Sequence, residues 1–157
     1  MNNKGVTLVE LIVVFVIIAI GATLATPTIG AWLPKYRIRG ATRDIVSTMR
    51  DAQMRAVASN ARFRVNFSAG EFGCPANSYI LQQQNTLGGW DNNGACQTLP
   101  PGITINLVLD DDKAVFNPDC TCSSDTRTAT LSYIKEGITK EQRVIRVRPS
   151  TGRVTAD

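Results

Sequence analysis

The N-terminal end of this chain is an apolar stretch long enough to cross a lipid bilayer. Val6 to Ala25 are twenty residues, and a helix rises about 1.5 Å per residue, which matches the ~30 Å hydrocarbon core of a bilayer. The polar residues in this stretch are Thr7, Glu10 and Thr23. A carboxylate near the centre of such a segment costs about 2.5 to 3.5 kcal/mol, so it is expected to have a functional partner. The sequence therefore predicts one membrane-spanning helix with a single functional acid.

A partner for Glu10 arises if the chain is cut after Gly5. The new amino group would then lie on Val6, where it is the nearest cation to the acid. In a bundle of identical chains, the amine of one chain can meet the carboxylate of the next. Glu10 would in that case be an assembly contact between subunits.

The residues around this position resemble a known processing signal. Lys4-Gly5 followed by Val6-Thr7-Leu8-Val9-Glu10 is similar to the cleavage and methylation signal of type IV prepilins and type II secretion pseudopilins, and Pro27 fits the same pattern. The resemblance implies that a prepilin peptidase cuts between Gly5 and Val6 and that Val6 is then N-methylated. It also implies that the mature helix, with Glu10 and Pro27, packs against its neighbours as the filament core. The family usually has Phe where this chain has Val6.

Two other interpretations of the same stretch remain. One is a secretory signal peptide cut near residues 22–25, which would carry an acid inside its apolar region. The other is a plain single-span anchor, which leaves Glu10 without a role.

The spacing of apolar residues changes near residue 61. From Lys35 to Ala61 they recur at steps of three and four, which predicts an amphipathic helix with its arginines largely on the opposite face. Glycine and proline between Gly21 and Pro34 predict that the helix before it is kinked or soft. Beyond residue 61 apolar and polar residues alternate, which predicts strands at 62–67, 78–83, 103–109, 114–116, 128–134 and 142–148, with a long loop at 85–102.

These patterns together predict an α+β, pilin-like fold. A long N-terminal α-helix, membrane-spanning in its first half and amphipathic in its second, packs on a C-terminal antiparallel β-sheet head. The predicted parts are a leader peptide at 1–5, a transmembrane and filament-core helix at 6–28, the amphipathic second half of the helix at 29–61 and a β-rich globular head at 62–157. This order resembles the GspH and FimT branch of pilin-like proteins.

Four cysteines follow the membrane segment: Cys74, Cys96, Cys120 and Cys122. The family resemblance places this part outside the cytoplasm, where an even number of cysteines favours disulfide bonds. A bridge between Cys120 and Cys122 would need a strained tight ring, so we expect each of them to join one of Cys74 and Cys96. A zinc site is the alternative.

The sequence contains no sign of catalysis. Because the chain has no histidine, a histidine-based triad and a histidine metal site are excluded. It also lacks a phosphate-binding loop and a dinucleotide-binding motif. We predict that it is not an enzyme and that it holds no metal and no cofactor. Asp110-Asp111-Asp112 is explained by a solvated turn, with calcium binding as the alternative.

Arginines near the C-terminus suggest an alternative function. Arg143, Arg146, Arg148 and Arg153 lie in or beside Thr151-Gly152-Arg153-Val154, which is similar to an element at the C-terminal end of GspH and FimT proteins. Some FimT-like minor pilins take up DNA through a Gly-Arg-x-Arg element there, whose second arginine is replaced here by Thr155. Several spaced arginines can still neutralise phosphates, so these residues are candidates for DNA binding.

We therefore predict a minor pilin or pseudopilin, a structural subunit of a type IV pilus or a type II secretion pseudopilus. The resemblance implies that its partners are other pilin or pseudopilin subunits, a prepilin peptidase and an inner-membrane assembly platform. It implies a single-pass location in the bacterial inner membrane with the head outside the cytoplasm, followed by the filament.

Overall fold

The computed structural model describes residues 5–67, 73–107, 113–123, 128–135 and 138–157, with the side chains of 24–31, 106–107, 135, 138 and 140 left undescribed. Within this part the chain forms two compact units, Met1–Lys35 and Tyr36–Asp157.

The N-terminal unit consists mainly of the first part of helix α1, which spans Leu8–Ser59. The helix is continuous through Pro27 and Pro34, so these residues do not interrupt it. Its apolar side chains before residue 24 are exposed, as at Ile17, which is 64% exposed. Within the described part of the chain, no helix has the length and apolar character needed to cross a membrane.

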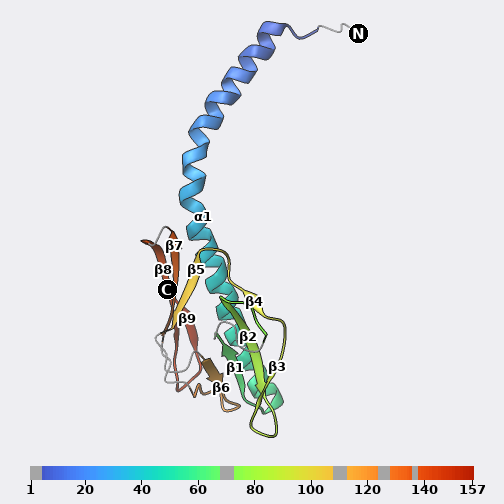
Figure 1. Ribbon diagram of the computed structural model, residues 1–157, viewed down its shortest axis with the longest axis vertical. Coiled ribbons are helices and arrows are strands. Elements are labelled where there is room, and N and C mark those ends of the chain that lie inside the picture. Colours follow the sequence, from blue (N-terminus) through green and yellow to red (C-terminus); the bar gives the residue numbers. More distant parts are fainter. Residues whose placement is uncertain (1–4, 68–72, 108–112, 124–127, 136–137) are drawn as a thin grey trace. The chain divides into compact units, whose positions relative to one another are not determined.

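The head unit is built on the second part of α1. Side chains at helical spacing form its buried face, and this confirms the predicted amphipathic period. They share one hydrophobic core with residues of two sheets that lie alongside this part of α1 (Figure 1). The fully or nearly fully buried helix residues are Ile38, Ala41, Ile45, Met49, Ala52 and Ala56.

Within the described residues, the first sheet of the head has five strands in the order β3-β2-β1-β6, with β4 paired to β2 outside this path. All its strand pairs are antiparallel, and β1 lies between β2 and β6. Its strands are β1 (Phe63–Asn66), β2 (Ser78–Gln84), β3 (Trp90–Asn92), β4 (Gln97–Thr98) and β6 (Lys113–Phe116).

The second sheet has four strands in the order β5-β7-β8-β9, again antiparallel throughout. Among the strands that the structure describes, β9 pairs with β8 alone and so lies at the edge of this sheet. Its strands are β5 (Ile103–Leu107), β7 (Thr128–Lys135), β8 (Ile138–Val147) and β9 (Val154–Ala156).

The predicted strands are all present, but two strands lie where a loop was expected. The segment 85–102 contains β3 and β4, which both pair with β2. The strand β8 also begins at Ile138, earlier than the alternation of apolar residues suggested. These extra strands are short or carry mostly polar residues, so apolar alternation could not reveal them.

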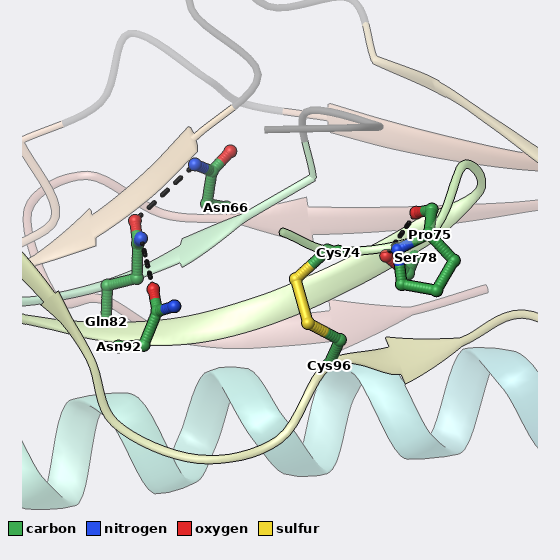
Figure 2. The surroundings of a disulfide bond; sticks show 7 residues. All are labelled: Asn66, Cys74, Pro75, Ser78, Gln82, Asn92 and Cys96. Atoms are coloured by element: carbon green, nitrogen blue, oxygen red, sulfur yellow. Dashed lines mark hydrogen bonds between the residues drawn. A yellow bond between two sulfur atoms is a disulfide. The ribbon is translucent and has the colours of Figure 1, made fainter. Parts of the chain in front are cut away.

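The disulfide bond joins Cys74 to Cys96, so the expected pairing of each with Cys120 or Cys122 is wrong. Figure 2 shows the bond beside the ribbon of β2. Cys74 precedes β2 and Cys96 precedes β4, whose Gln97 pairs with Tyr79, so the two Cα atoms lie 5.7 Å apart. Cys120 and Cys122 follow β6, which β1 separates from β2.

The turn between β8 and β9 approaches α1 closely at Gly152. The side chain of Gln53 donates a hydrogen bond from Nε2 to the Thr151 carbonyl oxygen at 3.1 Å. Gly152 has a φ of 58°, and a Cβ added there would lie 2.7 Å from both Gln53 Nε2 and the Cys120 carbonyl oxygen. Only glycine fits this position without displacing a neighbour, and the turn sets β9 within reach of the helix.

Candidate functional site

The predicted processing site lies at the start of α1. Val6 is exposed, and the helix begins two residues later. Thr7 donates to Glu10 Oε2 from its backbone N–H at 3.0 Å and from its hydroxyl at 2.9 Å, while the Glu10 N–H donates to Thr7 Oγ1 at 3.3 Å. These bonds form a reciprocal capping box, which satisfies donors that the first turn of a helix otherwise leaves free.

The capping box gives Glu10 a local role in addition to the assembly contact predicted from the sequence. The spacing Thr7-Leu8-Val9-Glu10 is the Thr-x-x-Glu pattern by which such a box can be recognised. An ionised carboxylate has about four acceptor positions, so two bonds from Thr7 leave room for a further donor. The box is therefore compatible with a second partner for Glu10.

Exposed apolar side chains surround Glu10 along the first part of α1. Soluble monomers rarely expose continuous apolar surface of this extent, so another molecule or a lipid phase is expected to cover it. Pro27 also lies in this part of α1, but its side chain is outside the described residues. The exposed side chains include Leu8, Val9, Leu11, Ile12, Val13, Val14, Phe15, Val16, Ile17, Ile18 and Ile20.

The remaining cysteines lie on the loop after β6. Cys120 is exposed and has a φ of 66°, whereas Cys122 is buried and its N–H donates to the Pro149 carbonyl oxygen at 2.8 Å. Among the described residues, no three His, Cys, Asp or Glu side chains gather where they could hold a metal ion. The candidate calcium residues 110–112 are outside the described residues.

The same loop holds a second carboxylate bound by a threonine. Asp119 Oδ1 accepts hydrogen bonds from the Thr121 hydroxyl at 2.6 Å and from the Thr121 N–H at 3.0 Å. These bonds lower the pKa of Asp119, because they stabilise its charged form. The arrangement accounts for Asp119 as part of a local turn.

The four C-terminal arginines do not form one cluster. Side chains alternate along β8, and the buried Ile145 and Val147 share a face with Arg143. Arg146 therefore lies on the other face, where its Nη1 is 3.1 Å from Asp157 Oδ2. Arg148 follows on that outer face, and its N–H donates to the Arg153 carbonyl oxygen at 3.0 Å. Of the four candidates, Arg146 and Arg148 line one hollow of about 470 Å³.

Arg143 lies instead beside a different set of arginines. Two hollows, of about 380 and 340 Å³, share Thr42, Arg43 and Ala156 in their walls. We name the combined feature the arginine groove; its basic residues are Arg39, Arg43, Arg50 and Arg143. It runs between α1 and β9. The sequence places the helix arginines largely opposite the apolar face, and nothing in it places residue 143 next to residue 43.

Comparisons with known proteins found a match to the N-terminal segment and a match to the fold. Residues 1–26 match the family model described as the prokaryotic N-terminal methylation motif. No curated protein matches the chain.

Solved structures match the fold of most of the chain. The type IV minor pilin FimU of Pseudomonas aeruginosa (strain PAO1) aligns with a TM-score of 0.58 and 14% identity, over 78% of this chain and 90% of FimU. The minor pseudopilin EpsH from the type 2 secretion system of Vibrio cholerae aligns with a TM-score of 0.58 and 14% identity, over 76% of this chain and 95% of EpsH. The chain is therefore pilin-like: it combines the prokaryotic N-terminal methylation motif with the fold of minor pilins and minor pseudopilins.

Proposed function

We propose that this protein is a structural subunit, a minor pilin or pseudopilin, of a type IV pilus or a type II secretion pseudopilus. The observation that carries the proposal is the methylation motif at residues 1–26, which includes the start of α1 and its exposed apolar side chains. The pilin-like fold of the head supports it. Such a subunit acts by assembly and performs no catalysis.

In this proposal the apolar part of α1 is first held in the bacterial inner membrane, with the head outside the cytoplasm. Val6 to Ala25 are twenty residues, which is the length of one span, although no helix within the described residues has both the length and the apolar character required. A prepilin peptidase removes residues 1–5, Val6 is N-methylated, and an assembly platform in the inner membrane moves the subunit into the filament. Neighbouring helices then cover the side chains that are exposed in the single chain.

The acid at Glu10 supplies the register of this assembly. In apolar surroundings an unpaired carboxylate is costly, and the capping bonds from Thr7 satisfy only part of its acceptor capacity. Cleavage after Gly5 creates a cation on Val6 of each subunit. The ion pair between Glu10 of one subunit and the Val6 amine of its neighbour forms only at the correct axial offset.

Two substitutions separate this role from simple helix capping. Glu10→Gln keeps an oxygen that accepts from Thr7 but removes the charge, whereas Thr7→Val removes the hydroxyl and keeps the charge. We expect the first to abolish incorporation into filaments and the second to preserve it, as measured by the subunit's presence in sheared filaments. If Glu10→Gln assembles normally and Thr7→Val does not, Glu10 is only a cap.

Processing is tested by the mass of the protein purified from membranes. We expect a mass that lacks residues 1–5 and carries one added methyl group on Val6. A mass that includes the first five residues would contradict the proposal.

DNA binding is a second candidate function, favoured by the two arginines that share the outer face of β8. Arg146 and Arg148 line a hollow there, and Arg153 pairs with Arg148 through the backbone. We expect salt-sensitive binding of duplex DNA that is lost when Arg146, Arg148 and Arg153 are changed to Gln. No retention of DNA at low salt would remove this candidate.

A further inference from the structure

We propose that the arginine groove binds an extended, carboxylate-rich polypeptide segment, which adds as a strand to the free edge of β9. This proposal does not depend on the proposed filament role, because it rests on the charges of the groove and on the backbone of β9.

The groove carries positive charge that the described residues do not neutralise. None of the ion pairs in the described part of the chain involves Arg39, Arg43, Arg50 or Arg143. The acid in its wall, Asp157, is already paired with an arginine of the outer face of β8 at 3.1 Å. Excess guanidinium groups in a concave site favour an anionic ligand.

The Arg143 side chain gives a second indication that a ligand binds in the groove. In the described structure its Nε is buried and has no hydrogen-bond partner. Buried donors in native proteins are nearly always paired, so we expect the Arg143 side chain to turn toward the groove when a ligand supplies an acceptor. A carboxylate suits this position, because it matches the planar donor arrangement of a guanidinium.

The free edge of β9 offers backbone groups to the same ligand. Arg148 N–H donates to the Arg153 carbonyl oxygen and Asp157 N–H to the Val144 carbonyl oxygen, which fixes the alternation of hydrogen bonds between β8 and β9. In an antiparallel pair, the backbone groups of every second residue point away from the partner strand. The backbone groups of Val154 and Ala156 therefore point away from β8.

One of these outward groups already contacts the groove. Arg50 Nη2 donates to the Val154 carbonyl oxygen at 3.4 Å. Ala156 lines both hollows of the groove, and by the same alternation its backbone N–H and carbonyl point away from β8 toward the groove. An unpaired edge of this kind is a template for a further strand.

The spacing of the helix arginines fits an extended peptide. Arg39 and Arg43 are one turn apart on α1, about 6 Å along its axis. Alternate side chains of a strand recur about every 6.6 to 6.8 Å on one face. Acidic residues at every second position can thus meet successive arginines, while the backbone bonds to β9. A nucleic acid could bind the arginines, but it has no peptide backbone that could pair with the edge of β9.

Binding of a designed peptide tests the charge requirement. The probe is a fluorescein-labelled heptapeptide that alternates Glu and Thr, added to the intact protein in non-ionic detergent micelles at low salt and followed by fluorescence anisotropy. We expect Arg39→Gln/Arg43→Gln to raise the dissociation constant about tenfold or more, since two charge-assisted hydrogen bonds are lost. The matched control Arg146→Gln/Arg148→Gln removes equal charge from the other face and should change it less than about twofold.

A second pair of variants tests the backbone requirement. Ala156→Pro removes an outward N–H and leaves the bonds between β8 and β9, which Asp157 and Arg148 make. We expect it to abolish detectable binding of the heptapeptide, whereas Ala156→Ser, which keeps the N–H, should bind like the wild type. Near-ultraviolet circular dichroism of each variant establishes that the head is still folded.

The other outcomes each overturn the proposal. No binding of the heptapeptide, or equal losses in both arginine double variants, would mean that the groove has no specific role. Unchanged binding by a folded Ala156→Pro variant would remove strand addition. If a duplex of DNA bound with the same dependence on Arg39 and Arg43 while the heptapeptide did not bind, the groove would be a phosphate site instead.

Discussion

The two parts of α1 carry similar apolar side chains in opposite surroundings. In the head unit Ile45 is 0% exposed, packed with both sheets in one core. In the N-terminal unit Ile17 is 64% exposed, and its neighbours on the helix are exposed with it. One continuous helix thus contains a segment whose apolar face the chain covers itself and a segment whose apolar surface the chain leaves open.

This difference separates the apolar side chains that stabilise the head from those that the chain leaves exposed to other molecules. Burial of apolar surface stabilises a fold, so mutations in the second part of α1 should act on the stability of the head. Mutations in the first part should leave the head intact and act on the association of the helix with lipid or neighbouring subunits. The comparison therefore predicts different readouts for the same kind of substitution.

The largest effect is expected from shortening a buried isoleucine. Ile45→Ala should lower the free energy of unfolding of the head by about 2 to 5 kcal/mol, because it removes buried methyl groups and leaves a cavity. Ile17→Ala is the matched control and should leave this free energy unchanged. Urea unfolding of the intact protein in non-ionic detergent, followed by near-ultraviolet circular dichroism, gives both values. Equal losses of unfolding free energy in the two variants would contradict the difference between the two parts of α1.

Removal of the disulfide should have the next largest effect, again limited to the head. The bond between Cys74 and Cys96 spans a sequence separation of 22 residues. Cys74→Ser/Cys96→Ser should therefore cost about 3 kcal/mol of head stability, by the restriction that the bond places on the unfolded chain. The control Cys120→Ser changes an exposed residue and should stay within about 0.5 kcal/mol of the wild type. The reverse order of effects would show that Cys120 contributes a bond of its own.

The sequence predicted local features of this molecule better than distant ones. The spacing of Ile38, Ile45 and Met49 identified the buried helix face, and alternation such as Phe63 and Val65 identified strands, because both are set by near neighbours in the chain. The partner of Cys74 was missed because it depends on β2, β1 and β6 being adjacent in that order.

The two candidate sites differ in the same way. The arginine groove was missed because Arg43 and Arg143 meet only through the folded sheet. The capping box of Thr7 and Glu10 is local and could have been predicted. It was not predicted, because the family resemblance already explained Glu10 as an assembly contact.

Substitution of two glycines, one in each unit, should have smaller effects on stability. Gly152→Ala should lower the free energy of unfolding of the head by about 1 to 3 kcal/mol, because the residue has a positive φ and its Cβ would clash with Gln53 and Cys120. Gly21 lies in the first part of α1 with no atom within 4 Å of an added Cβ. Gly21→Ala should leave the head unchanged and favour the helix by up to about 1 kcal/mol. Unfolding by urea and helix content by far-ultraviolet circular dichroism measure the two effects.

The smallest effect comes from two carboxylates that are bound by threonine in the same way, one in each part of the molecule. Asp119 accepts the hydroxyl and N–H of Thr121, and Glu10 accepts those of Thr7. The bonds from Thr121 lower the pKa of Asp119 in the folded head below its ordinary value of 3.8. Its contribution to stability is therefore present above the unfolded-state pKa and is lost as the pH falls through the folded-state pKa.

Thr121→Val should accordingly lower the urea midpoint of the head at pH 7 and have less effect near pH 3, where Asp119 in the unfolded chain is protonated. Thr7→Val makes the same change in the other unit and should leave the midpoint unaltered at both pH values, because Glu10 lies in the N-terminal unit and not in the head unit. A Thr121→Val effect that is equal at pH 7 and pH 3 would contradict the role of the Asp119 charge. An effect of Thr7→Val on the midpoint would mean that the two parts of α1 unfold together, and the contrast between Ile17 and Ile45 would then have to be measured by association alone.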